Sequence, residues 1–166
     1  MARYNKKLLA AIADRLNKNS SLGNVKITLH PDGYWLFEQE GARELTRQQC
    51  NGESAEQKTV WGWLCEQHPQ MVRLTWHTPN EIAANAFYGA QQKQMGKQSG
   101  VSDLVTLYGA GGAFELKRVN PALYRMSKEQ KQFLQAVAAS GKFACCAWGA
   151  VAMQRAIMFY LQDEWR

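Results

Sequence analysis

Three ionisable residues in the middle of the chain could together support metal-dependent chemistry. Glu115 and Lys117 are separated by one residue in an apolar segment, residues 113–117. Side chains two positions apart on a strand point to the same face, so a carboxylate and an ammonium group would lie side by side. A hairpin with the preceding apolar segment would bring the carboxylate of Asp103 close to them. Two adjacent carboxylates repel unless a cation lies between them, and their hard oxygens suit Mg²⁺ or Mn²⁺.

The position of Asp103 depends on how the two strands of this hairpin pair. The segments 103–108 and 113–117 have the pattern of short apolar strands, and the glycine-rich residues between them are typical of a tight turn. With a three-residue loop, Tyr108 would pair with Gly112 and Asp103 would lie opposite Lys117. All three ionisable side chains would then share one face. A slip of one residue would move Asp103 to the other face.

Such an arrangement predicts phosphodiester hydrolysis. A bound dication would activate water and screen the scissile phosphate, while Lys117 would position that water or stabilise the developing negative charge. The alternative is structural: a surface salt bridge between Asp103 and Lys117, beside a solvated Glu115. The spacing of these three residues does not by itself separate the two interpretations.

The segments around the hairpin carry regular helix and strand patterns. Ser54 and Ser127 each begin a capping-box sequence, with Gln57 and Gln130 three positions later. The order from residue 54 onward is α, β, α, β, β, α, β, α, which indicates an α/β (α+β) domain. We expect helices from residue 54 to about 68, over 81–94, from 127 to about 140 and over 151–161, and further strands over 72–76 and 142–148.

The first 50 residues form, by this interpretation, an N-terminal appendage to a main domain over residues 54–166. Residues 4–18 have the spacing of an amphipathic helix with a basic side. Residues 25–29 and 34–37 flank a Pro-Asp-Gly turn and predict a hairpin. The aromatic side chains of this hairpin, Tyr34 and Trp35, would either stack on DNA bases or pack in the core.

Composition limits the class of protein. The 166 residues include 20 Lys and Arg against 14 Asp and Glu, giving a formal charge of +6, which suits a polyanionic partner and equally fits a merely basic protein. We find no signal peptide and no apolar run of membrane-spanning length, and therefore expect a cytoplasmic protein without a membrane partner. The cysteines lack metal-binding spacing, and we expect reduced thiols, with Cys145 and Cys146 on opposite faces of a strand.

Three segments in sequence order resemble one family of nucleases. Residues 100–105, 114–118 and 126–131 are similar to the G-x-P-D-L, E-L-K and S-x-x-Q segments of the VRR-NUC branch of the PD-(D/E)XK nucleases. The resemblance covers about residues 54–161, and it departs from the family pattern at Ser102, where the family has proline. It implies a restriction-endonuclease-like core with a mixed central sheet flanked by helices.

The resemblance also implies roles for residues beyond the central three. Glu56, on the helix before the core strands, would hold metal-bound water or a second metal, or would be a first-turn glutamate favoured by the helix dipole. Gln130 would contact the nucleophilic water or a phosphate, or would serve only as the capping-box partner of Ser127. Asn80, in a Pro-Asn-Glu segment that borders the family's site, would contact nucleic acid there or cap the following helix.

Basic residues near the proposed cleft are further candidates for nucleic-acid contacts. Lys93, Lys97 and Arg118 would meet phosphates, or would be ordinary solvated charges. By resemblance, the function we expect is a Mg²⁺- or Mn²⁺-dependent endonuclease that cleaves branched or junction DNA and acts as a homodimer. The competing hypothesis is a catalytically idle nucleic-acid-binding or inhibitor module on a nuclease-like scaffold.

Overall fold

A mixed sheet of six strands forms the centre of the molecule. The computed structural model describes residues 24–78, 91, 94–96 and 98–166. In space the strands follow the order β1-β2-β6-β5-β4-β3, in which β2, β6 and β5 are parallel and the outer pairings are antiparallel. The strands are β1 (Val25–Leu29), β2 (Trp35–Gln39), β3 (Thr75–His77), β4 (Leu104–Thr106), β5 (Gly112–Lys117) and β6 (Phe143–Trp148).

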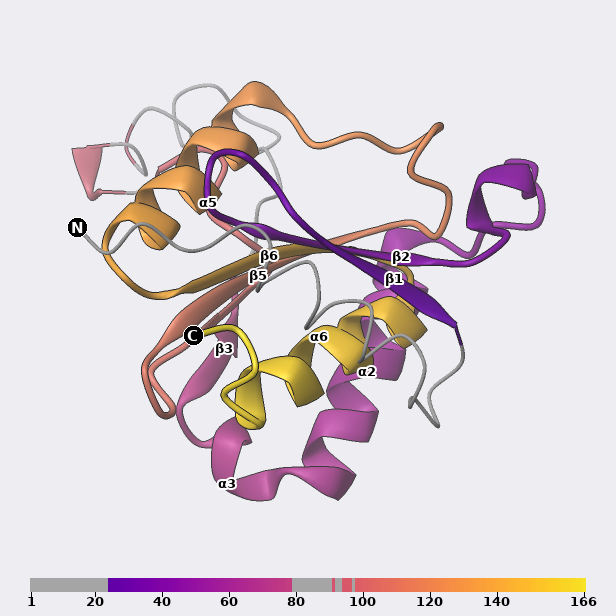
Figure 1. The fold of residues 1–166 in the computed structure, drawn as a ribbon. Helices are drawn as coiled ribbons and strands as arrows, with labels where there is room; N and C mark the ends of the chain where they lie inside the picture. Colours follow the sequence, from indigo (N-terminus) through magenta and orange to yellow (C-terminus); the bar gives the residue numbers. More distant parts are fainter. Residues whose placement is uncertain (1–23, 79–90, 92–93, 97) are drawn as a thin grey trace.

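Helices cover both faces of this sheet (Figure 1). One face carries α5, which packs against β5 and β6, and the opposite face carries α2 and α6. The resulting α+β arrangement of a mixed sheet with flanking helices confirms the expected fold class. The helices within the described residues are α2 (Glu53–Gln67), α3 (Pro69–Val72), α5 (Lys128–Ala139) and α6 (Ala150–Leu161), with a short 3-10 helix, η1 (Ala42–Glu44).

The two central strands, β5 and β6, are buried along their whole length because helices cover both of their sides. On β5, Phe114 and Leu116 belong to the larger core beneath α2 and α6, whereas Ala113 belongs to the smaller core beneath α5. The alternation of side chains therefore places Glu115 and Lys117 on the α5 side of the sheet. Cys145 and Cys146 likewise divide between the two cores, and all four cysteines are free thiols, as expected.

The N-terminal hairpin belongs to this sheet and is not separate from it. β2 pairs in parallel with β6, from Trp35 opposite Cys145 to Glu38 opposite Trp148. Phe37 is fully buried and meets Phe159 of α6 edge to face, with ring centroids 5.5 Å apart. The hairpin that we expected in an appendage thus extends the main sheet, because its apolar side chains complete the core under α6. The expected helix over residues 4–18 lies outside the described residues.

Two helix starts illustrate how capping patterns can succeed or fail. At α5, Ser127 is the N-cap and forms both bonds of a capping box with Gln130, as the sequence predicts. At α2, the N-cap is Gly52, which has no side chain to form a cap, and the helix begins one residue before Ser54. The capping box predicted at Ser54 is therefore wrong, and Glu53 becomes the first helical residue.

The segment after α2 also differs from expectation. The residues predicted to form one strand over 72–76 instead form the end of α3, a turn and the start of β3. The reason is that a short helix, α3, begins at Pro69, with His68 as its N-cap. The expected helix over 81–94 falls almost wholly on residues that the structure does not describe. In the described part of the chain, no helix is both long and apolar enough to cross a bilayer.

Replacing Phe37 with alanine tests whether the hairpin is an integral part of the core. Because the ring is fully buried between β2 and α6, Phe37→Ala should lower the free energy of unfolding of the whole chain by about 3–5 kcal/mol, in one cooperative transition. Urea unfolding followed by fluorescence measures this loss. The control is Lys26→Ala on the exposed side of β1, which should change stability little. Loss of the hairpin alone, with the rest unfolding as in wild type, would contradict the assignment.

Candidate active site

The pairing of β4 with β5 determines where Asp103 lies. Leu104 pairs with Phe114 and Thr106 with Gly112, so the same register continued by one step sets Asp103 opposite Glu115. We predicted Lys117 as the partner, which is wrong by two residues. Because side chains alternate with a period of two, this shift leaves Asp103 on the expected face. Asp103, Glu115 and Lys117 therefore converge on the α5 side, although the predicted register does not hold.

The longer loop between β4 and β5 explains the shift. β4 ends at Thr106, whose hydroxyl accepts a hydrogen bond from the backbone N–H of Tyr108 at 3.1 Å. The hydroxyl of Tyr160, on α6, donates to the carbonyl of Tyr108 and accepts from the N–H of Gly111. These bonds satisfy backbone groups that strand pairing would otherwise use. A side chain from a distant helix thus lengthens the turn from three residues to the five residues 107–111.

Asp103 is held from both its side chain and its backbone. Its Oδ2 accepts a hydrogen bond from the N–H of Leu116 at 2.8 Å. Its carbonyl accepts a hydrogen bond from the N–H of Thr78 at 2.9 Å, and Nδ1 of His77 lies 2.9 Å from the same oxygen. The carboxylate is therefore fixed against β5, at the point where the side chains of Glu115 and Lys117 emerge.

Glu115 is fully buried, and its two carboxylate oxygens have different surroundings. Oε1 lies 2.8 Å from Nζ of Lys117 and also accepts a hydrogen bond from Nε2 of Gln130. Oε2 is buried and finds no hydrogen-bond partner among the described residues. One oxygen of this carboxylate thus has two protein donors, while the other accepts no hydrogen bond from the described residues.

Gln130 joins α5 to the site: it is the capping-box partner of Ser127, and it also bonds to Glu115, whereas contact with the nucleophilic water or a phosphate stays a prediction. Its Oε1 accepts from the N–H of Ser127 at 2.8 Å, which completes the capping box. Its Nε2 donates to Glu115. A single amide side chain therefore fixes the start of α5 and the orientation of the buried carboxylate together.

A second acid approaches Lys117 from α2. Oε1 of Glu53, the first residue of α2, lies 3.6 Å from Nζ of Lys117. Unlike Lys117, whose side chain is almost wholly buried, Glu53 is about half exposed. The sequence prediction missed this residue because it started the helix at Ser54. Had Gly52 been recognised as the N-cap, Glu53 would have been the first acidic residue of the helix.

Glu56 occupies a different place from the one that the resemblance implies. Its side chain is buried, and Oε2 accepts a hydrogen bond of 2.7 Å from the N–H of Ala150, at the start of α6. It satisfies a free backbone donor there and joins α2 to α6. In the described residues, no group of three or more His, Cys, Asp or Glu side chains is placed to hold a metal ion. The structure therefore does not bring Glu56 together with Asp103 and Glu115.

The predicted nucleic-acid contacts have mixed outcomes. Asn80, Lys93 and Lys97 lie outside the described residues. Arg118 donates hydrogen bonds of 2.7 Å to the carbonyls of Asn51 and Cys50, and its guanidinium stacks on the ring of Tyr124. The guanidinium group of Arg118 is thus bonded to the backbone of the segment before α2.

Burial and mutual repulsion shift the protonation of this cluster. Burial raises the pKa of Glu115 to about 8, and the negative charge of Asp103 adds to the increase, while Lys117 opposes it. Burial also raises the pKa of Asp103, against the stabilising N–H of Leu116. For Lys117, burial lowers the pKa, but attraction to Glu115 and Glu53 outweighs burial, and the net shift is upward. At neutral pH the ammonium keeps its proton, and the two carboxylates share a site that opposes double ionisation.

Comparison with known proteins agrees with this architecture. A solved structure named "VRR_NUC domain protein" superposes with a TM-score of 0.56 at 22% sequence identity, covering 68% of this chain and 90% of that chain. No family model matches the sequence, and no curated protein matches it. At this level of identity the likeness shows the fold. The chain therefore has a restriction-endonuclease-like fold, of the kind found in a VRR_NUC domain protein.

The raised pKa of Glu115 predicts a specific dependence of stability on pH. The folded chain should bind a proton at Glu115 more tightly than the unfolded chain, so stability should fall as pH rises from about 4.5 to about 8. The contribution is about 1.4 kcal/mol for each unit by which the two pKa values differ. Urea unfolding in EDTA across this range measures it. Glu115→Gln should remove much of the slope, while the matched Glu66→Gln on exposed α2 surface should not. Equal slopes for wild type and Glu115→Gln would refute the assignment.

Proposed function

We propose that this protein is a divalent-metal-dependent endonuclease that hydrolyses phosphodiester bonds of DNA. The observation that carries the proposal is the convergence of Asp103, Glu115 and Lys117 on one side of two paired strands. A surface salt bridge, the structural alternative, does not fit these residues, because all three side chains are buried and Glu115 has no exposure to solvent. Burying two acids beside one cation is unfavourable for stability alone, and such clusters are typical of functional sites.

The donor set fits a hard divalent cation. Oε2 of Glu115 is buried without a hydrogen-bond partner among the described residues, and the carboxylate of Asp103 enters the same cluster. Mg²⁺ commonly binds through one or two protein carboxylates and retains several waters, so a third protein ligand is not required. Asp103 and Glu115 would hold Mg²⁺ or Mn²⁺, which would supply Lewis-acid stabilisation of phosphate oxygens and an activated water.

The neighbouring residues have distinct tasks in this proposal. Lys117 keeps its proton, because attraction to Glu115 and Glu53 outweighs the effect of burial on its pKa, and its ammonium group stabilises negative charge that develops on the phosphate. Gln130 holds Oε1 of Glu115, so that Oε2 is left to bind the ion. Glu53 restrains Lys117 from the α2 side. Glu56 acts as a structural residue at the start of α6.

The finer features of the substrate are proposed by analogy alone. The family resemblance supports branched or junction DNA as the substrate and a homodimer as the active form, with one site for each of two strands. A substrate panel of junctions, flaps, single strands and plain duplex tests the first feature. Light scattering with and without junction DNA tests the second.

Substitution of the central residues should separate catalysis from binding. Asp103→Asn or Lys117→Ala should lower the cleavage rate roughly a hundredfold or more, since the first removes a charged ligand of the metal and the second removes the ammonium group that stabilises the phosphate. DNA binding should remain largely intact. The assay is cleavage of labelled junctions, flaps and duplexes in Mg²⁺ or Mn²⁺, with Glu66→Gln as the matched control that should cleave at the wild-type rate.

Two outcomes would contradict the proposal. Wild-type rates in either central variant would show that these residues are not catalytic. Absence of cleavage by the wild-type chain on every substrate and in both metals would favour the competing idle module, which binds nucleic acid without hydrolysing it.

Metal binding should also be visible without any substrate. A cation that binds only the folded state stabilises it by mass action, by about 2.7 kcal/mol at a hundred times its dissociation constant. We expect Mn²⁺ to raise the thermal unfolding midpoint of the wild-type chain and of Glu66→Gln. The increase should be absent in Asp103→Asn and Glu115→Gln. An equal increase in all four proteins would indicate that the ion binds elsewhere.

A further inference from the structure

The loop that follows the central strand has an unusual charge composition. Residues 118–127, here called the β5–α5 loop, connect β5 to α5. From Lys117 to Lys128 the sequence contains four basic residues and no Asp or Glu. Two of these, Lys117 and Arg118, are already engaged, with Glu115 and with backbone carbonyls. The other two, Arg125 and Lys128, are exposed.

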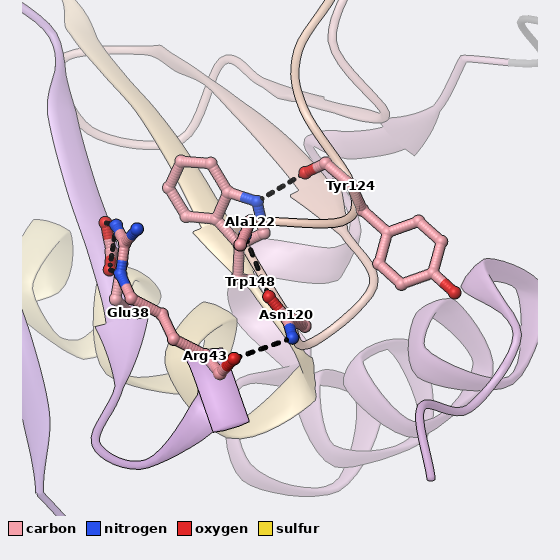
Figure 2. A network of polar contacts seen from close by, with 6 residues as sticks. All are labelled: Glu38, Arg43, Asn120, Ala122, Tyr124 and Trp148. Atoms are coloured by element: carbon pink, nitrogen blue, oxygen red, sulfur yellow. Dashed lines mark hydrogen bonds and ion pairs between the residues drawn. The ribbon is translucent and has the colours of Figure 1, made fainter. Parts of the chain in front are cut away.

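A buried asparagine fixes this loop to the segment before α2 (Figure 2). Asn120 is only 2% exposed, and its Nδ2 donates to the carbonyls of Leu45 at 2.7 Å and Arg43 at 3.1 Å. Its Oδ1 accepts from the N–H of Ala122 at 2.8 Å, within the β5–α5 loop itself. One side chain thus satisfies backbone groups in two irregular segments, which gives the loop a defined shape without regular secondary structure.

A small apolar cluster and Arg118 reinforce this attachment. Val119 packs with Ala42 and Cys50 in a core of their own, next to Tyr124. Arg118 donates to the carbonyls of Asn51 and Cys50 from the same side. Irregular segments held this firmly on a rigid sheet are typical of binding loops, which need a fixed shape at the surface.

The β5–α5 loop is joined to the candidate active site on both sides of Arg125, at Tyr124 and at Ser127. Nε1 of Trp148 donates to the carbonyl of Tyr124 at 2.7 Å (Figure 2), and Trp148 is the strand partner of Lys117. At the other end, Gln130 bonds to the backbone of Ser127 and to Glu115. The backbone of Arg125 lies between these two attachments, and Lys128 directly follows the second.

The charges of Arg125 and Lys128 are exposed and remain available to a partner. Neither forms an ion pair with a described residue, whereas Arg43, in the facing segment, is paired with Glu38 through hydrogen bonds of 2.8 to 3.1 Å (Figure 2). The acid nearest to Lys128 in the first turn of α5 is Glu129, which bonds to Ser127. Lys128 is itself the first residue of α5, where the helix dipole disfavours a cation. The attraction between Lys128 and the exposed carboxylate of Glu129 is therefore opposed by the helix dipole.

We propose that Arg125 and Lys128 bind the phosphodiester backbone of the DNA and guide it to the cluster of Asp103, Glu115 and Lys117. Arg118 and Asn120 are positioning residues that hold the β5–α5 loop in place. This inference rests on the proposed function and assigns the backbone contacts to residues other than those that the sequence suggested. Contacts to phosphates are commonly made by Arg and Lys and carry no sequence information. They weaken as the salt concentration rises, because the release of counterions from the DNA on binding becomes less favourable.

The test is the salt dependence of DNA binding by the full chain. Binding of a short fluorescent duplex is measured in EDTA by anisotropy over a series of salt concentrations, so that no cleavage occurs. The double variant Arg125→Ala/Lys128→Ala should bind roughly tenfold more weakly near physiological salt. Its slope of log affinity against log salt should be reduced by about 0.9 for each lost contact. Arg125→Lys/Lys128→Arg should keep most of the affinity, because charge is retained.

The matched control removes the same charge elsewhere. Lys26 on β1 and Arg73 after α3 are both exposed and lie on the two edge regions of the sheet, so Lys26→Ala/Arg73→Ala should bind as wild type does. Equal weakening of both double variants, an unchanged slope in Arg125→Ala/Lys128→Ala, or no binding by wild type would overturn the inference. Thermal unfolding checks the fold, and Lys128→Ala should not lower the midpoint.

Kinetics distinguish this inference from the proposed function. If the wild-type chain cleaves DNA, Arg125→Ala/Lys128→Ala should raise KM while kcat stays within about twofold, because these contacts are equal in the ground and transition states. Cleavage with unchanged KM in this variant would contradict the proposed DNA contacts of Arg125 and Lys128, but it would not contradict the proposed active site. If no substrate is cleaved, the proposed function fails, and the binding slope still decides the role of the loop.

Discussion

The carboxylate of Glu115, removed entirely from water in the middle of a sheet, constrains everything around it. A buried carboxyl group is costly without polar partners, and here Lys117 and Gln130 both reach Oε1. Through Gln130 the same carboxylate is tied to the first turn of α5, and through Lys117 it is tied to Glu53 at the first residue of α2. One acidic side chain is thus linked to the starts of two helices on opposite sides of the sheet.

In this fold, the polar residues that hold neighbouring segments together differ from the residues that are free to bind a ligand. Glu56 and Arg118, which the sequence suggested for ligand contacts, bond to backbone groups of neighbouring segments, whereas Arg125 in the β5–α5 loop and Lys128 at the start of α5 are exposed. Such a division is expected physically, because a long polar side chain that must hold two elements together loses its freedom to meet a partner.

Sequence patterns were most informative where the cause of a structure is local. Alternation placed Glu115 and Lys117 on one side of β5, and the capping box of Ser127 and Gln130 forms as predicted. Prediction failed where the cause is distant or leaves no side-chain signature. Gly52 caps α2 without a side chain, the hydroxyl of Tyr160 lengthens the β4–β5 turn from another helix, and the membership of the N-terminal hairpin in the sheet depends on β6, near the other end of the chain.

That last pairing has a consequence for how the molecule assembles. β2 finds its neighbour only after β6 has been made, since β6 follows all the other described strands in sequence and lies between β2 and β5. Until then the hairpin and the later strands are two separate half-sheets, each with an open hydrogen-bonding edge and bare apolar residues such as Phe37. Long-range parallel pairing of this kind is slow to form. A chain that lacks the β6–α6 unit therefore cannot close the sheet, and it exposes strand edges that can pair with other chains.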